Sequence, residues 1–201
     1  MRAILVAASL ALGSLAATST WAETVEVANV KYETAVDIAG QKLQLNGAGI
    51  RYKFVVKVYT AALYLTTKAS TTQEVLAAHG PKRIHITMLR EIDGNELGKL
   101  FTKGMEANTP REEFVKSING VLKLSEVFAT RKALVAGDSF SVDYIPGIGS
   151  TLMLNGKPLM TEPIKEPEFF TGLLRIWLGD KPADDGLKDA LLGIKKERRR
   201  Q

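Results

Sequence analysis

Few side chains in this sequence have the types and spacing that catalysis or metal binding requires. The two histidines, His79 and His85, fall on different predicted elements, and no Asp or Glu stands at helical spacing from either, so we expect no metal site. The sequence contains no Gly-x-Ser-x-Gly elbow and no phosphate-binding loop. Adjacent carboxylates at 112–113 and 184–185 are typical of helix starts or solvated surfaces. We expect no cofactor.

One apolar stretch, residues 45–65 (LNGAGIRYKFVVKVYTAALYL), carries the most informative polar groups, a single arginine and three tyrosines. Asn46, Gly47 and Gly49 form a turn signal, because glycine tolerates positive φ. The residues that follow, 52–59, are rich in β-branched and aromatic side chains. The stretch therefore predicts a turn followed by one long strand that is buried on at least one face.

Two motifs resemble a known family. The turn Gly47-x-Gly-x-Arg51 is followed by the strand Lys57-Val-Tyr-x-x-x-x-Tyr-Leu65, and residues 177–193 read WLGDKPADDGLKDALLG. Together, and in this order, they resemble the chalcone isomerase-like superfamily, in particular its bacterial exported branch, over residues 36–193. The resemblance implies an α+β fold, in which a large curved antiparallel sheet has helices packed on one face and a cleft between the two layers.

The resemblance also bears on catalysis. The plant isomerases of the superfamily place a tyrosine, a lysine and an asparagine on the helix after a Thr-Met strand, here Thr87-Met88. A gapless alignment puts Leu97, Leu100 and Gly104 at those three positions. Leucine cannot donate a hydrogen bond or hold a water, so the polar catalytic helix is replaced by an apolar wall. This disfavours an isomerase.

Fatty-acid-binding members of the superfamily fit better. They hold a carboxylate with an arginine and a tyrosine above an apolar pocket, and Arg51 and Tyr59 match these two positions. A guanidinium pairs a carboxylate through two parallel hydrogen bonds, and a phenol adds one more donor. The apolar tunnel would be lined by one helical stripe: Leu97, Leu100, Phe101 and Met105.

The spacing of Arg51 and Tyr59 raises a difficulty. On one straight strand the two residues would lie roughly 26 Å apart, too far to share a carboxylate. Either a bulge or a turn between them brings them together, or they do not form one site. Tyr64 is an alternative partner, although its parity along the strand is opposite. Plainer interpretations are a surface or ion-paired Arg51, a core tyrosine at 59 and simple core packing of the helical stripe.

Alternation of polar and apolar residues predicts strands at 25–32, 83–90 and 139–145 and hairpins turning at 39–41 and 155–156. Helices are expected over 72–78, 166–178 and 187–192. A further helix begins at the N-cap Asp93, and another begins at Thr109-Pro110. The last of these has a predicted buried stripe of Phe114, Ile118, Val121 and Leu122. Hairpins at both ends and helices between them favour an α+β domain.

The N-terminus resembles a secretory signal peptide. Arg2 precedes an apolar run over residues 3–17, and Thr20-Trp21-Ala22 supplies small residues before a cut after Ala22. The alternative, a membrane anchor, is disfavoured because the run is shorter than the roughly 20 residues of a membrane span. We expect the cleaved segment 1–22, a single domain over 23–194 and a periplasmic or secreted protein. The sequence has no cysteine, so its core must stabilise it without disulfides.

The positive charge is concentrated at the C-terminus. Residues 195–201 hold five bases and one acid, and residues 23–194 hold 21 of each. Such a tail is typically solvated and disordered, and it could contact anionic lipid head groups weakly. No basic stripe alternates with aromatic residues, so we expect no nucleic-acid binding.

The sequence leads to one favoured function and two alternatives. The favoured one is a non-catalytic periplasmic protein that binds a fatty acid or a similar small apolar carboxylate. The first alternative is an isomerase or lyase that acts on an unsaturated carbonyl compound. The second is a cell-envelope scaffold, in which the fold is solid and the basic tail makes the contacts.

Overall fold

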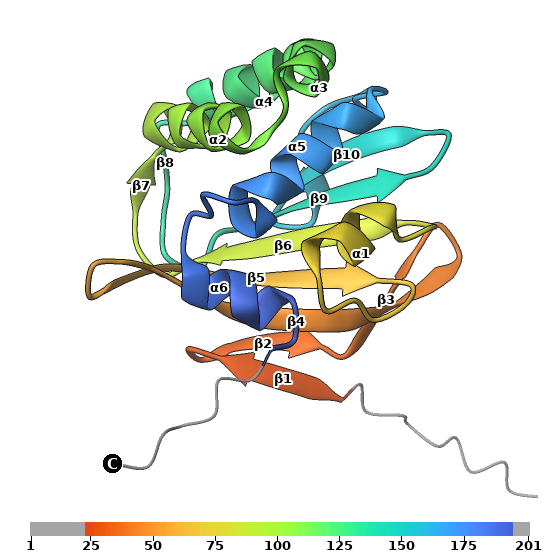
Figure 1. Ribbon diagram of the computed structural model, residues 1–201. Coiled ribbons are helices and arrows are strands. Elements are labelled where there is room, and N and C mark those ends of the chain that lie inside the picture. The colour runs from red at the N-terminus through yellow and green to blue at the C-terminus, as the bar shows by residue number, and fades with distance from the viewer. Residues whose placement is uncertain (1–22, 195–201) are drawn as a thin grey trace, which may run out of the picture.

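The computed structural model describes residues 23–194, so the predicted signal peptide and basic tail lie outside the described residues. Its centre is a curled antiparallel sheet of seven strands in the order β11-β10-β9-β6-β5-β4-β3 (Figure 1). The strands are β3 (Ala35–Ile38), β4 (Gln41–Lys53), β5 (Val56–Leu65), β6 (Lys82–Met88), β9 (Ser139–Ile145), β10 (Gly149–Leu154) and β11 (Lys157–Pro158). The expected large antiparallel sheet of an α+β fold is confirmed.

Helices cover one face of this sheet. They are α1 (Thr72–Ala77), α2 (Gly94–Asn108), α3 (Arg111–Lys116), α4 (Ile118–Ala129), α5 (Pro167–Leu178) and α6 (Asp185–Leu191). The larger of two hydrophobic clusters fills the space between these helices and the sheet, with Trp177 and Phe169 among its largest fully buried side chains. Within residues 23–194, no helix has the length and hydropathy needed to span a membrane.

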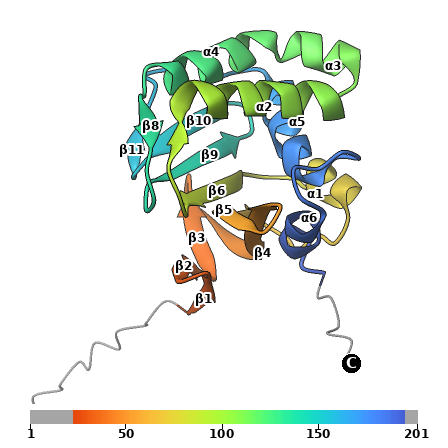
Figure 2. The same ribbon diagram turned by 90° about the vertical axis from the view of Figure 1, so that its left-hand side faces the viewer.

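The other face of the sheet is covered by a hairpin of β1 (Thr24–Val27) and β2 (Val30–Glu33). A second cluster, which includes Tyr32, Leu43 and Tyr64, joins this hairpin to the sheet. Figure 2 shows the layers, with α2, α3 and α4 at the top, the sheet below them and the β1–β2 hairpin at the bottom. A short pair, β7 (Ile92–Asp93) and β8 (Ala133–Leu134), lies at the start of α2.

The expected single long strand is wrong. The chain turns back at Phe54 and Val55, so β4 and β5 form a hairpin. The turn lacks the usual Gly or Asn, and Phe54 itself takes the left-handed conformation with φ +58°. The glycines that predicted a turn, Gly47 and Gly49, lie instead inside β4. The strand expected over 25–32 is likewise a hairpin, which turns at Ala28 and Asn29.

Stronger local signals gave correct elements. The turns at 39–40 and 155–156, the strand over 139–145 and the helices near 72–77 and 167–178 are confirmed. Asp93 caps α2 as expected, and its carboxylate accepts the Glu96 N–H at 2.9 Å. Each of these elements is determined by turn or capping residues that lie within a few positions of one another in the sequence.

The helix expected from Thr109 onward is divided in two. Thr109 ends α2, α3 begins after Pro110, and the chain breaks again at Ser117 before α4. This break changes the phase of the buried face, so Ile118 and Leu122 of the predicted stripe are exposed. The buried face of α4 consists of Gly120, Val121, Leu124 and Phe128.

Candidate functional site

A bulge in β4 decides which way Arg51 faces. Leu43 and Leu45 point to the β1–β2 side, and strict alternation would place Arg51 there too. The pairing with β5 shifts register between Leu45 and Gly47, which moves every later side chain to the opposite face. Arg51 therefore points toward the helices and pairs directly with Tyr59.

Asn46, the extra residue of this bulge, is fixed by the C-terminal part of the chain. Its side-chain amide donates to the carbonyls of Leu191 at 2.7 Å and Ala69 at 2.9 Å. Beyond it, α6 lies so close to β4 that a Cβ on Gly47 would overlap the carbonyl oxygen of Ala190. Gly47 and Gly49 are thus required by the close approach of α6. The hydrogen bonds of Asn46 hold the bulge that turns Arg51 toward the helices.

Arg51 and Tyr59 line one cavity of about 290 Å³ beneath α2. Its apolar walls come from β5, β7, α2 and α5: Val58, Ile92, Leu97, Leu100, Phe101, Gly104, Ala107 and Ile176. The residues of its lining that carry charge are Arg51, Lys103 and Lys181. A small apolar space whose charged lining residues are all basic fits an anion with an apolar body.

Tyr59 is buried and presents its hydroxyl as a donor. The indole N–H of Trp177 donates to the Tyr59 oxygen at 2.8 Å, which leaves the phenol's own proton free of any acceptor within residues 23–194. Burial raises the pKa of Tyr59 to about 12, opposed by the Trp177 hydrogen bond and the nearby Arg51 charge. The phenol therefore stays protonated at neutral pH.

Arg51 has an aromatic neighbour but, within residues 23–194, no ion pair. Its guanidinium carbon lies 5.7 Å from the centre of the Tyr59 ring, a cation–π distance. Among residues 23–194, no carboxylate lies within 4.0 Å of it. The negative charge of the nearby Asp184 acts to raise the pKa of Tyr59. The Asp184 carboxylate accepts hydrogen bonds from the backbone N–H groups of Tyr52 at 2.9 Å and Leu187 at 2.8 Å. The guanidinium is thus available to a ligand.

Five of the six residues predicted for the site come together in this cavity: Arg51, Tyr59, Leu97, Leu100 and Phe101. Met105 does not, because it is fully buried and packs against Gly172 of α5. Tyr64, the alternative partner, lies on the other face, where its hydroxyl donates to the Glu33 carbonyl at 3.1 Å. The turn at 54–55 accounts for the convergence of Arg51 and Tyr59.

Comparison with known proteins identifies the family. The sequence profile of the family described as chalcone isomerase-like matches residues 24–193. This chain belongs to the chalcone isomerase-like family. Among solved structures it is similar to a fatty-acid binding protein from Arabidopsis thaliana, with a TM-score of 0.65 and 11% sequence identity over 85% of this chain and 96% of that chain. Comparison with curated protein sequences found no match.

The two sequence motifs that resembled this chalcone isomerase-like family contact each other in the fold. Gly47 and Gly49 lie under Ala190 of α6, and Tyr59 receives the hydrogen bond of Trp177. The three helix positions aligned with isomerase side chains, Leu97, Leu100 and Gly104, all line the cavity. At Gly104, a Cβ would lie 3.1 Å from the Ile176 side chain, so the packing of α2 on α5 accounts for this glycine.

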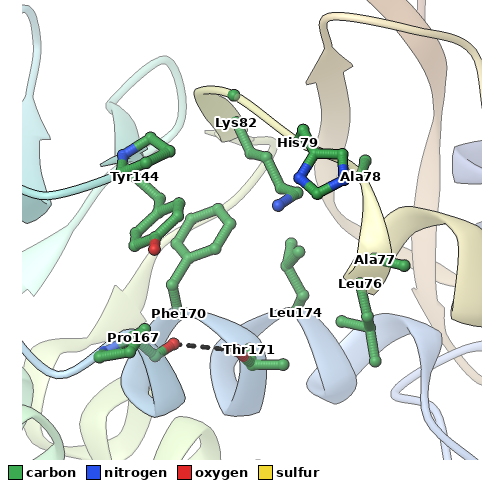
Figure 3. A pocket seen from close by; sticks show the side chains of 12 residues that line it. Leu76, Ala77, Ala78, His79, Lys82, Tyr144, Pro167, Phe170, Thr171 and Leu174 are labelled. Carbon is green, nitrogen blue, oxygen red and sulfur yellow. Dashed lines mark hydrogen bonds between the residues drawn. The ribbon is translucent and has the colours of Figure 1, made fainter.

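Lys82, which was not predicted from the sequence as a site residue, lines a second cavity of about 390 Å³ between α1, β6, β9 and α5. Figure 3 shows its side chain reaching between His79 and the rings of Tyr144 and Phe170. Lys82 is only 7% exposed, its ammonium lies 5.6 Å from the Tyr144 ring centre, and burial lowers its pKa. Residues two positions apart in a strand face the same side of the sheet, so the position of Lys82 two residues before the inward-facing Ile84 indicates that Lys82 also faces inward.

Trp177 and Tyr59 depend on each other for stability. We expect Tyr59→Phe to lower the free energy of unfolding by about 1–3 kcal/mol, because the buried indole N–H loses its acceptor. The double variant Tyr59→Phe/Trp177→Phe should cost less than the sum of the two single variants, since it removes both polar groups. Urea denaturation of the four proteins measures this, and strictly additive losses would show that the hydrogen bond does not couple the two residues.

Proposed function

We propose that this protein binds a small apolar carboxylate, such as a fatty acid, in the Arg51 cavity and does not catalyse a reaction on it. The observation that carries the proposal is that Arg51 and Tyr59, two residues able to donate hydrogen bonds, line one apolar space. Arg51 has no ion pair within residues 23–194, and the protonated Tyr59 hydroxyl has a proton to give. Bidentate pairing with the guanidinium and one hydrogen bond from the phenol would hold a carboxylate.

The size of the cavity favours a modest ligand. A volume of about 290 Å³ lies at the lower end of typical small-molecule pockets, which start near 300 Å³. The basic side chains Lys103 and Lys181 add positive charge and attract an anion toward the same space. The fold similarity to a fatty-acid binding protein is consistent with this ligand class.

Two features support a binding role over catalysis. Leu97, Leu100 and Gly104, which occupy the three helix positions aligned with isomerase side chains, line the cavity and cannot transfer a proton. The Tyr59 phenol, with a pKa of about 12, is a hydrogen-bond donor at neutral pH and a poor base. We further propose a periplasmic or secreted location, which rests on the sequence of residues 1–22 alone.

Ligand binding can be tested with decanoate and with decanol, which has the same chain without the carboxylate. We expect wild-type protein to bind decanoate more tightly, and Arg51→Met to bind decanoate tenfold to a hundredfold more weakly, as the loss of a charged hydrogen-bonded pair predicts. Decanol binding should change little. Isothermal titration calorimetry gives the affinities, and native mass spectrometry identifies any acyl carboxylate that co-purifies.

Two matched variants make the result specific. Arg90→Met removes an exposed arginine that does not line the cavity, and Lys82→Met removes the cation of the second cavity. Both should retain decanoate binding. If Lys82→Met loses binding and Arg51→Met keeps it, the ligand belongs in the second cavity; if wild type binds no decanoate and carries no lipid, the proposed function is wrong.

A further inference from the structure

The tip of the β4–β5 hairpin exposes large apolar side chains that the core does not use. Phe54 is 93% exposed and Val55 is 90% exposed, and the flanking Tyr52 and Val56 are more than a third exposed. Figure 1 shows this loop projecting at the left-hand end of the sheet, away from the helices. A contiguous exposed apolar surface of this kind marks an interaction site more often than a lone exposed residue does.

Folding stability does not account for Phe54. It is the first residue of a two-residue turn and has φ +58°, a conformation that glycine adopts freely and a bulky residue adopts at a cost. Its ring also gains no burial. Phe54 is therefore unfavourable in both backbone conformation and solvent exposure within the isolated protein. A contact with another molecule would explain why a phenylalanine stands there.

The tip carries positive charge as well. Residues 51–57 contain Arg51, Lys53 and Lys57 and no acid. The groove beside the hairpin is mixed in charge, because three bases and three acids line it: Arg51, Lys53, Arg90, Glu91, Asp93 and Glu96. The excess of positive charge therefore lies at the hairpin tip itself, next to its exposed apolar side chains.

The tip also lies close to the cavity. Arg51 and Val58, which lie near the tip of the hairpin, line the cavity, and Phe54 is three residues beyond Arg51. Three residues of extended chain span roughly 10 Å, and apolar groups of interfacial segments penetrate roughly 5–10 Å into a bilayer. An inserted tip would hold the Arg51 end of the cavity at the level of the lipid head groups.

We propose that the β4–β5 hairpin docks on an anionic phospholipid bilayer, with Phe54 and Val55 in the interface and Lys53 and Lys57 against the head groups. Apolar side chains flanked by lysines are the combination that binds such surfaces. The docking goes beyond carboxylate binding and does not depend on it.

The test is partition of the purified protein onto vesicles of equal parts phosphatidylglycerol and phosphatidylcholine, with the same N-terminus in every variant. We expect Phe54→Ser/Val55→Ser to reduce partition at least tenfold, because it removes the inserted groups. Lys53→Gln/Lys57→Gln should reduce it by about fivefold per lysine and weaken its dependence on salt. Pure phosphatidylcholine vesicles should bind wild type more weakly.

The matched control is Val115→Ser/Leu122→Ser, which removes two apolar side chains that are 58% and 57% exposed on α3 and α4. It should partition like wild type. Equal partition by the hairpin variant, or loss of partition only when residues 195–201 are deleted, overturns the proposal. A hairpin variant that changes the oligomeric state and leaves partition unchanged overturns it in favour of a protein contact.

The vesicle-partition test and the decanoate-binding test can be interpreted independently of each other. Phe54 and Val55 do not line the cavity, so their variant should bind decanoate like wild type in the absence of vesicles. Arg51→Met should lose decanoate and keep most of its partition. Failure of either proposal therefore leaves the other measurable.

Discussion

Replacing Gly47 by alanine is expected to lower the free energy of unfolding by about 3 kcal/mol or more. The new Cβ would overlap the carbonyl oxygen of Ala190 and lie 2.8 Å from that of Leu191. Both obstacles are backbone atoms of the last turn of α6, so no side-chain rotation relieves the clash. Helix α6 would have to move away from β4, and the buried hydrogen bond from Asn46 to Leu191 would be lost with it.

Urea denaturation followed by circular dichroism measures this loss, and Gly98→Ala is the matched control. A Cβ on Gly98 would lie 3.6 Å from the nearest atoms of α4, an ordinary contact, in the interior of α2. Since alanine is the better helix former, this variant should be neutral or more stable by up to about 1 kcal/mol. Wild-type stability in Gly47→Ala would mean that α6 is not held against β4 in solution.

Acid should destabilise the protein through His85, with the free energy of unfolding about 2 kcal/mol lower at pH 5 than at pH 7 from this residue alone. Burial, aided by the positive charge of Arg83 and opposed by Asp143, lowers the pKa of His85 from 6.5 to about 4. The ring lies edge-on to Tyr32, with centroids 5.8 Å apart, under the β1–β2 hairpin. Between pH 6.5 and 4 the unfolded chain binds a proton that the folded one excludes, so stability falls as pH falls through this range.

The comparison of His85→Gln with wild type isolates this effect from that of the carboxylates. The variant should lose about 2 kcal/mol less than wild type between pH 7 and pH 5. His79→Gln is the control, because His79 is the one other histidine in the sequence and its side chain is exposed. Parallel pH profiles for wild type and His85→Gln would show that His85 is solvated or protonated in the folded protein.

The sequence predicted elements well where the signal was local, and poorly where a distant contact decided the geometry. Asn155-Gly156 and the Asp93 cap each work within a few residues, and both are confirmed. The 54–55 turn has no such signal, because Phe and Val occupy it. The role of Gly47 was predicted wrongly for a related reason, since Ala190, the residue whose close approach requires a glycine there, lies more than 140 residues later in the chain.

The cavity was partly predictable. The family resemblance pointed to Arg51 and Tyr59, and helical periodicity grouped Leu97, Leu100 and Phe101. Periodicity could not separate these from Met105, because the stripe on α2 is wider than the cavity and its C-terminal part packs on α5. Periodicity also could not predict which face of the sheet Arg51 occupies. The inward and outward positions along β4 exchange at the bulge, and the bulge is evident only from the tertiary contacts of Asn46.

The contact between Asn46 and Leu191 joins residues 145 positions apart. Contacts at such separations form late, because a long loop must close before they contribute. The strand that carries Arg51 therefore acquires its neighbour α6 only when almost the whole chain is present. A polypeptide that ends before residue 185 contains every residue that lines the cavity but lacks the helix that fixes the bulge orienting Arg51.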